Sequence, residues 1–163
     1  TKGDAQRIEL ALWRKNKGYG RVWYSSFGLN ITSAILNKEK ARDAGLVNVL
    51  ASKEDPMTGL EWQQVKASAW MRKGSLIDSV EPIWTIARAS YNTSCSVCHR
   101  QPDEAHFDTN TWPGLFAGMV GFTSIDQDTA RVVLKYLQSH SSDFSTTQHG
   151  AGSPESALQT ARP

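Results

Sequence analysis

One short run limits what this chain can fold into more than any other feature. Cys95-Ser96-Val97-Cys98-His99 is a C-x-x-C-H motif and contains both cysteines of the sequence. If the run lies on a helix, Cys95 and Cys98 are three residues apart and share one face. The two thiols can then form thioethers along one haem edge, and His99 can turn its imidazole under the iron as proximal ligand. The motif predicts one covalently attached haem c.

Three other uses of the two cysteines remain open. A structural zinc site needs four ligands, and the thiolates could be joined by His106 and by either His140 or His149. A thioredoxin-like redox pair also uses C-x-x-C, but it normally follows a strand of a βαβ unit, a pattern that this sequence lacks. A plain disulfide or buried thiol pair leaves the adjacent histidine unexplained. Haem accounts for all three residues together.

Length and hydropathy bound the class of protein. The chain has 163 residues, enough for one domain or two small ones with a buried core. No apolar run is long enough to span a membrane, so no direct membrane insertion is expected. The sequence starts at Thr1 without a signal peptide, which suggests a processed or excised piece. Because bacteria attach haem c after export, the cofactor points to the periplasm.

The formal net charge of +2 conceals an asymmetry along the chain. Residues 1–77 contain 13 Lys and Arg against 7 Asp and Glu, whereas residues 94–143 contain 3 against 6. An acidic rim beside a redox centre could steer the basic patch of a partner, in which case salt would slow the encounter. The alternative is an ordinary solvated surface. No nucleic-acid partner is expected.

The first half of the chain carries mostly β signals. Runs rich in β-branched and aromatic residues predict four strands, at residues 21–24, 29–36, 47–50 and 60–71, and residues 8–13 alternate loosely. Residues 37–43 are expected to form a loop or one helical turn. Short strands separated by turns predict a small SH3-like β-barrel.

Two local features refine this β region. Residues 53–59 form a strong turn signal, because Pro56 fixes φ and Gly59 permits a positive φ. In the strand that follows, the apolar side changes between Trp62 and Val65. A change of face within one strand predicts a β-bulge near residues 63–64.

The second half has helical periodicity. Three helices are expected, from Ser79 into the haem motif, from Thr111-Trp112-Pro113 to Gly121, and from a Ser124–Gln127 capping box to about Ser139. In the first of them Val80, Trp84, Ala87 and Tyr91 recur on one face. Residues 144–163 are polar, small and nearly uncharged, which predicts a disordered tail.

The chemistry of the haem depends on its second axial ligand. Met119 is favoured, because it lies twenty residues beyond His99 on a short helix that could close over the other haem face. His106 is the alternative, although a loop of seven residues must then round the haem edge. An open sixth position is a further possibility. Trp112 and Tyr136 are candidate haem-packing aromatics, though core residues by default.

Several separate motifs resemble one known family in the same order. They are Lys53-Glu54-Asp55-Pro56-Met57-Thr58-Gly59-Leu60-Glu61-Trp62, Cys95-Ser96-Val97-Cys98-His99-Arg100-Gln101-Pro102, residues 106–114 and Leu134-Lys135-Tyr136-Leu137-Gln138. Together they resemble the C-terminal region of the TorC-type pentahaem cytochromes, and the resemblance extends to Phe144.

The resemblance implies a periplasmic electron carrier of anaerobic respiration. In that family a membrane-anchored multihaem portion takes electrons from quinol, and the C-terminal monohaem domain passes them to a molybdenum-containing trimethylamine N-oxide or S-oxide reductase. This sequence has none of the other four haem motifs. The implied partners are therefore the terminal molybdoenzyme and the multihaem portion of the same parent protein.

These observations predict an α+β chain in two parts. Residues 1–77 are expected to form the SH3-like β-domain, residues 78–143 the α-helical cytochrome c domain, and residues 144–163 the tail. The expected function is one-electron transfer and not catalysis. Two alternatives remain open: a small haem enzyme with a free sixth position, and an interaction or redox-sensing module whose β-domain is the working surface.

Overall fold

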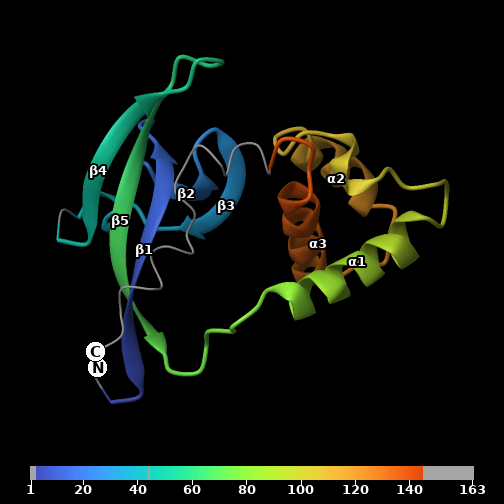
Figure 1. Ribbon diagram of the computed structural model, residues 1–163, viewed down its shortest axis with the longest axis horizontal. Helices are drawn as coiled ribbons and strands as arrows, with labels where there is room; N and C mark the ends of the chain where they lie inside the picture. The colour runs from blue at the N-terminus through green and yellow to red at the C-terminus, as the bar shows by residue number, and fades with distance from the viewer. Residues whose placement is uncertain (1–2, 44, 145–163) are drawn as a thin grey trace. The chain divides into compact units, whose positions relative to one another are not determined.

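The computed structural model describes residues 3–43 and 45–144, which form two compact units divided between Leu76 and Ile77 (Figure 1). The first unit is a β-sheet and the second is helical, so the chain is α+β as expected. The expected tail lies outside the described residues except for Phe144. No helix in the described ranges is both long and apolar enough to cross a membrane.

The β unit is one five-stranded antiparallel sheet in the order β3-β2-β1-β5-β4. Its strands are β1 (Ala5–Lys15), β2 (Val22–Ser26), β3 (Leu29–Ile35), β4 (Val47–Glu54) and β5 (Glu61–Arg72). A single 3-10 turn, η1 (Lys40–Arg42), precedes β4. Since β3 and β4 are edge strands that do not pair among the described residues, the sheet is open and the expected SH3-like barrel is not confirmed.

Both faces of this sheet are packed. Alternate residues of a strand point to opposite faces, so Trp62 and Val65, three apart in β5, are buried on different sides. Val65 joins Trp23 and Val47 in one apolar cluster. On the other side Trp62 contacts Tyr24, with ring centroids 5.1 Å apart. The change of face seen in the sequence therefore reflects a two-sided strand.

The predicted bulge lies on the neighbouring strand instead. The β1–β5 register runs without interruption from Ala5 opposite Arg72 to Lys15 opposite Trp62. The irregularity is in β4, where Val49 and Ala51 oppose the consecutive residues Val65 and Gln64. Leu50 is thus the extra residue, and it lies in β4 and not in β5 as predicted, because the change of face in β5 comes from burial on both sides of that strand.

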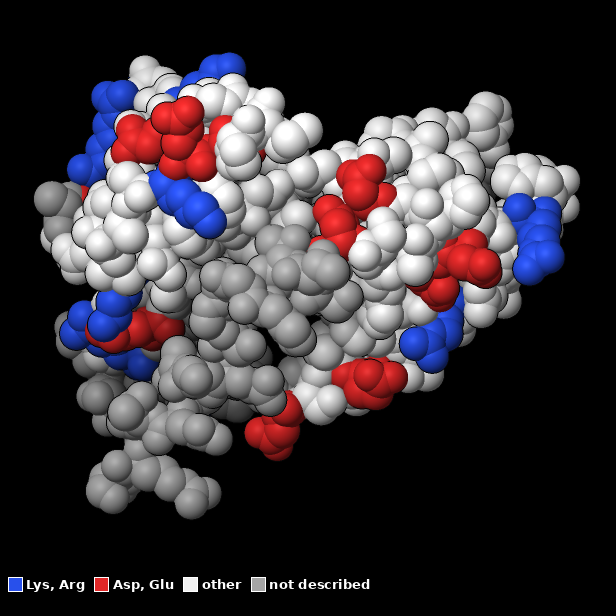
Figure 2. Space-filling view, turned by 45° about the horizontal axis from the view of Figure 1, so that its top comes forward, with Lys and Arg blue, Asp and Glu red and all other residues white. Residues whose placement is uncertain are grey.

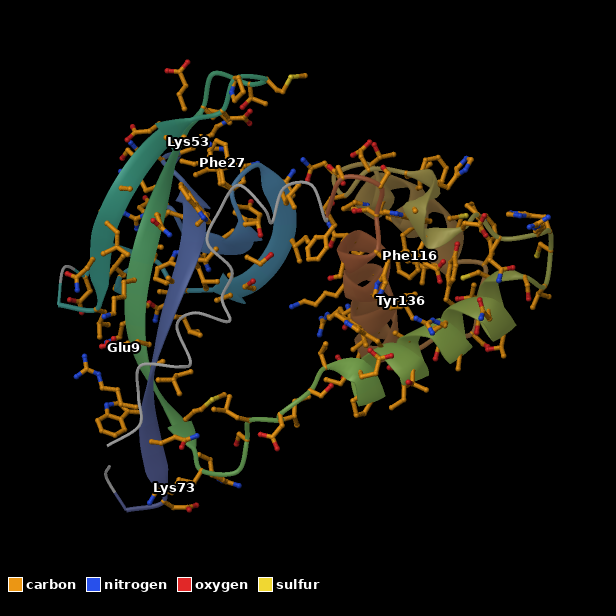
Figure 3. All side chains as sticks on the ribbon, in the orientation of Figure 1. Glu9, Phe27, Lys53, Lys73, Phe116 and Tyr136 are labelled. Carbon is orange, nitrogen blue, oxygen red and sulfur yellow. The ribbon has the colours of Figure 1, made fainter. Side chains whose placement is uncertain are left out.

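The helical unit contains α1 (Glu81–Cys95), η2 (Glu104–His106), α2 (Trp112–Val120) and α3 (Gln127–Ser139). Its core consists of Ala87, Tyr91, Trp112, Phe116, Val133, Tyr136 and Leu137. Figure 3 shows Phe116 and Tyr136 within this unit. The predicted apolar face of α1 is confirmed at Ala87 and Tyr91, but Val80 at its N-terminus is 45% exposed.

The cap of α3 differs from the prediction. Asp126 is the N-cap residue, and its Oδ1 accepts the backbone N–H groups of Asp128 and Thr129 at 3.0 Å each. Thr129 also donates its hydroxyl to the Asp126 carboxylate. The Ser124–Gln127 capping box is therefore wrong. Gln127 is the first residue of the helix, so it stands too early to bond back from the third helical position.

Replacing Asp126 by Ala should lower the free energy of unfolding of the helical unit by about 1 kcal/mol, since two backbone N–H groups lose their acceptor. Ser124→Ala is the control and should change it by less than about 0.5 kcal/mol. Denaturant unfolding followed by far-ultraviolet circular dichroism measures both. A larger loss for Ser124→Ala would contradict the assignment of the cap to Asp126.

Candidate functional site

The C-x-x-C-H motif begins where α1 ends. Cys95 is the last residue of the helix and packs partly buried against the helical core, while Cys98 and His99 lie in the turn that follows. The expected helix therefore leads into the motif at Cys95, and the rest of the motif is not helical. Ser96 donates its hydroxyl to the carbonyl of Asn92, which satisfies a carbonyl of the last helical turn. Burial raises the pKa of the Cys95 thiol.

A cleft of about 630 Å³ opens at this helix end. Its lining residues are Thr93, Ser94, Cys95, Val97, Cys98, His99, Met119, Phe122, Thr123 and Ser124. Both free thiols, the imidazole of His99 and the thioether of Met119 thus line one cavity, which comes from α1, the following turn and α2. Its volume lies within the ordinary range of small-molecule and cofactor sites.

The apolar residues around this cleft fit a large flat cofactor. Val97 is 77% exposed and Phe122 is 87% exposed, although both border the cavity. A tetrapyrrole held at Cys95 and Cys98 would cover such apolar surface, and burial of apolar area is favourable. The donor set, with two thiols, one imidazole and one thioether, is the set that haem c uses.

The orientation of His99 is set by its backbone neighbour. Its Nδ1 lies 2.9 Å from the carbonyl oxygen of Arg100, and a carbonyl can only accept, so Nδ1 carries the proton. Nε2 is then the nitrogen with a lone pair for a metal. His99 is therefore prepared as a ligand through Nε2.

Hydrogen bonds to the chain beyond the motif hold it against α1. The hydroxyl of Tyr91 donates to the carbonyl of Pro102 at 2.7 Å, and the amide of Gln101 donates to the Asn92 side chain at 3.0 Å. Both Tyr91 and Asn92 belong to the last turns of α1. The loop after His99 is consequently tied to the helix that carries Cys95, which limits how far the two thiols and the imidazole can separate.

A second network joins α1, η2 and α3 behind the motif. Arg88 donates to the hydroxyl of Tyr136 at 2.8 Å, and that hydroxyl donates to Oε1 of Glu104. Burial acts to raise the pKa of Glu104, but the Tyr136 hydrogen bond and the Arg88 charge outweigh it and lower that pKa. Burial and the Glu104 hydrogen bond raise the pKa of Tyr136. Glu104 is thus held ionised.

The other predicted site residues are not among those that line the cleft. Trp112 and Tyr136 are buried in the helical core, where Trp112 donates from its indole to the carbonyl of Glu104 at 3.0 Å. His106 is on η2, and its ring packs edge-on against Phe107 with centroids 4.5 Å apart. Of the predicted site residues, those that line the cleft are therefore Cys95, Cys98, His99 and Met119.

Sequence reasoning missed several residues of the cleft. The clearest is Phe122, which directly follows Gly121 at the end of α2. A large apolar residue in a turn is the sequence feature that could have identified it. The hydroxyl residues that line the cavity, Thr93, Ser94, Thr123 and Ser124, follow from no sequence pattern, because they come from two segments that meet only in the fold.

The zinc ligand set is not assembled in the part of the chain that the structure describes. There, no three His, Cys, Asp or Glu side chains gather as a metal ion would require. His140 packs against Trp84 and Tyr136, with centroids 5.9 Å and 4.3 Å away. His149 lies outside the described residues.

Comparison with known proteins points in one direction. Residues 1–76 match a family model described as the TorC third cytochrome c domain, a stretch that ends before the C-x-x-C-H motif. The cytochrome c-type protein TorC of Escherichia coli K12 is 38% identical over 148 residues, which are 91% of this chain and 37% of that protein. The cytochrome c-type protein TorY of Haemophilus influenzae is 28% identical over 142 residues, or 87% and 38%. The chain thus spans little more than a third of these relatives, and no solved structure matches it.

The Glu104 network generates a pH-dependent prediction. Because the pKa of Glu104 is lowered in the folded state, its charge stabilises the fold above its ordinary value of 4.5, and this contribution is lost as the pH falls through the lower folded value. Glu104→Gln keeps an acceptor for Tyr136 but cannot titrate. Its free energy of unfolding should therefore fall less steeply below about pH 4.5 than that of the unchanged protein.

Tyr136→Phe is the companion variant. It removes the donor to Glu104 and should cost about 1 kcal/mol at neutral pH, and it should also reduce the pH dependence. Denaturant unfolding at a series of pH values measures both variants. A Glu104→Gln profile that runs parallel to that of the unchanged protein would show that Glu104 has no such role.

Proposed function

The chain is a relative of the TorC-type cytochromes, and from this premise we propose that it is an electron-transfer module with one haem c in the cleft at the end of α1. The observation that carries the proposal is the convergence of both cysteines, His99 and Met119 on one cavity. These residues come from two separate segments, so chance spacing along the sequence does not account for their meeting.

Four residues of the cleft have specific roles in this proposal. Cys95 and Cys98 would attach the haem through thioethers, and His99 would ligate the iron through Nε2. Met119 would supply the other iron ligand, because it lines the cavity and His106 is not among the lining residues. Trp112 and Tyr136 act behind the site, where they hold α2 and α3 around it.

The bound haem would supply a one-electron couple between Fe(II) and Fe(III). The residues of the chain do the rest of the work. The carbonyl of Arg100 holds the His99 proton on Nδ1, and the loop contacts of Tyr91 and Gln101 limit movement of the ligand. A thioether from Met119 raises the reduction potential relative to a second imidazole.

The partners follow from the same resemblance. We propose that the module receives electrons from a membrane-anchored multihaem portion and passes them to a molybdenum-containing N-oxide or S-oxide reductase in the periplasm. Residues 1–77 and 78–143 would be its two domains. Residues 94–143 contain more acidic than basic side chains, which agrees with attraction of a basic partner surface, and Figure 2 shows acidic side chains interspersed with basic ones on the helical unit.

Covalent attachment is the first point to test. Acid-acetone extraction of the matured protein should leave the pigment with the polypeptide, because thioethers survive the treatment. Cys95→Ala combined with Cys98→Ala should release or lose it. Pigment that enters the organic phase from the unchanged protein would overturn the haem c assignment.

The distal ligand is tested by Met119→Ala. The variant should lose the sulfur-to-iron charge-transfer band in the near-infrared and have a lower reduction potential, since the thioether that favours Fe(II) is gone. Met57→Ala is the matched control, because Met57 is 90% exposed in the turn between β4 and β5 of the other unit. Spectroscopy and redox titration measure both.

Two outcomes would redirect the proposal. Absence of the sulfur-to-iron band from the unchanged protein, together with loss of its native spectrum in His106→Ala, would assign the distal position to His106. Fast binding of carbon monoxide or cyanide by the unchanged protein would favour a haem enzyme with a displaceable sixth ligand, whereas resistance to both favours a carrier.

A further inference from the structure

A second cleft, of about 280 Å³, lies in the β unit and has no part in the proposed haem site. It is formed by the end of β1, the connecting turn and the start of β2, and is lined by Lys15, Lys17, Tyr19, Gly20, Arg21, Val22 and Tyr24. Three cationic side chains and two phenol rings therefore surround one concavity.

Aromatic rings hold the cations around this cleft in place. Lys15 Nζ lies 5.3 Å from the ring centroid of Tyr24 and 5.1 Å from that of Trp62. On the other side, Lys38 Nζ and Arg42 Cζ each lie 4.3 Å from the centroid of Tyr19. These distances are typical of cation–π contacts, which order a cation without neutralising it. The cleft thus keeps its positive charge in defined positions.

The same pattern continues beside the cleft. Lys53 Nζ lies 4.3 Å from the ring centroid of Phe27, and Figure 3 shows both side chains close together in the β unit. Phe27 contacts Trp62 with centroids 5.7 Å apart, so the ring that supports Lys53 touches one that supports Lys15.

Carboxylates do not pair with these cations in the described part of the chain. The ion pairs found in the β unit join Arg7 and Lys66 to Glu9 on the central strands. Asp55 is influenced by Lys15, but its carboxylate is engaged mainly by the hydroxyl of Thr58 and the backbone N–H of Met57. The charge at the cleft is therefore available to a ligand.

Contacts with the rest of the β unit fix Gly20 and Arg21, two of the residues that line the cleft. Gly20 has φ +58, and a Cβ there would lie 3.1 Å from Cδ of Arg14, so the backbone passes close to that side chain. The Gly20 carbonyl accepts the indole N–H of buried Trp23 at 3.0 Å. Arg21 donates its Nε to the carbonyl of Leu36 at 2.8 Å, which anchors the guanidinium at the rim.

We propose that this cleft binds an acidic polypeptide segment of a partner protein. The cations stand over two different rings, Lys15 over Tyr24 and Lys38 with Arg42 over Tyr19, so an acidic segment with several carboxylates can contact both groups. A bilayer surface is flat and meets protruding cations, whereas a concave cleft admits a side chain that projects from a polypeptide. This proposal does not depend on the haem.

The test uses the full chain with its haem and a short poly-L-glutamate peptide as the probe. Amide shifts in an NMR titration should be concentrated in residues 15–24 and 38–42, and affinity should fall as salt rises. Lys15→Gln with Lys38→Gln, which removes one cation from each ring, should weaken binding about fivefold, as expected for the loss of two partly exposed charge contacts.

A matched control removes the same charge elsewhere. Arg7→Gln with Lys66→Gln deletes two cations of the same unit that are already paired with Glu9, and it should leave the affinity nearly unchanged. Tyr19→Leu retains every charge but removes the ring beneath Lys38 and Arg42. It should weaken binding about twofold, the effect of an exposed cation–π contact.

Four results would overturn the proposal. The first three are equal weakening by the two variant pairs, amide shifts concentrated outside residues 15–24 and 38–42, and binding of inorganic phosphate or phosphatidylglycerol vesicles at the cleft in preference to the peptide. Self-association of the chain that the peptide does not displace would also overturn it, since the occupant would then be a second copy. Unchanged amide spectra away from the substitutions confirm that each variant is folded.

Discussion

The position of Cys95 at the end of α1 is the constraint on which the helical unit depends. A haem edge presents two attachment points at a fixed separation, so the first thiol must be held while the second thiol and the imidazole follow in a defined turn. Burial of Ala87 and Tyr91 fixes α1 on the core, and the contact of Tyr91 with Pro102 returns the loop to the same helix. Packing of the core therefore fixes the position of the motif.

The same core explains why two candidate aromatics are away from the cleft. Trp112 and Tyr136 both donate a hydrogen bond to Glu104. Trp112 donates to the backbone carbonyl of Glu104, and Tyr136 donates to its carboxylate. Each ring thus has a polar partner inside the unit, and burying a large ring with its donor satisfied is favourable. Their contribution to the site is the placement of η2 and α2, and through α2 the placement of Met119.

The β unit uses its aromatic residues differently. Trp62 contacts both Tyr24 and Phe27, and these three rings also lie beneath Lys15 and Lys53. These rings contribute both to packing and to the order of a positive surface. The family model matches residues 1–76, which contain no cysteine. The two units differ in charge as well as in fold.

Local sequence determined the haem motif, the three helices, most of the strands and the turn at residues 53–59, because each depends on neighbouring residues or on one periodic face. It did not determine which residue caps α3, since Ser124 and Asp126 are both good caps and the helix start decides between them. The open sheet, the Leu50 bulge and the aromatic supports of the cations depend on strand pairing, which joins residues far apart in the chain. Likewise, only the tertiary structure brought Met119 and Phe122 to the cysteines and kept Trp112 and Tyr136 in the core, because the packing of α2 on α3 decides which side of each helix meets solvent.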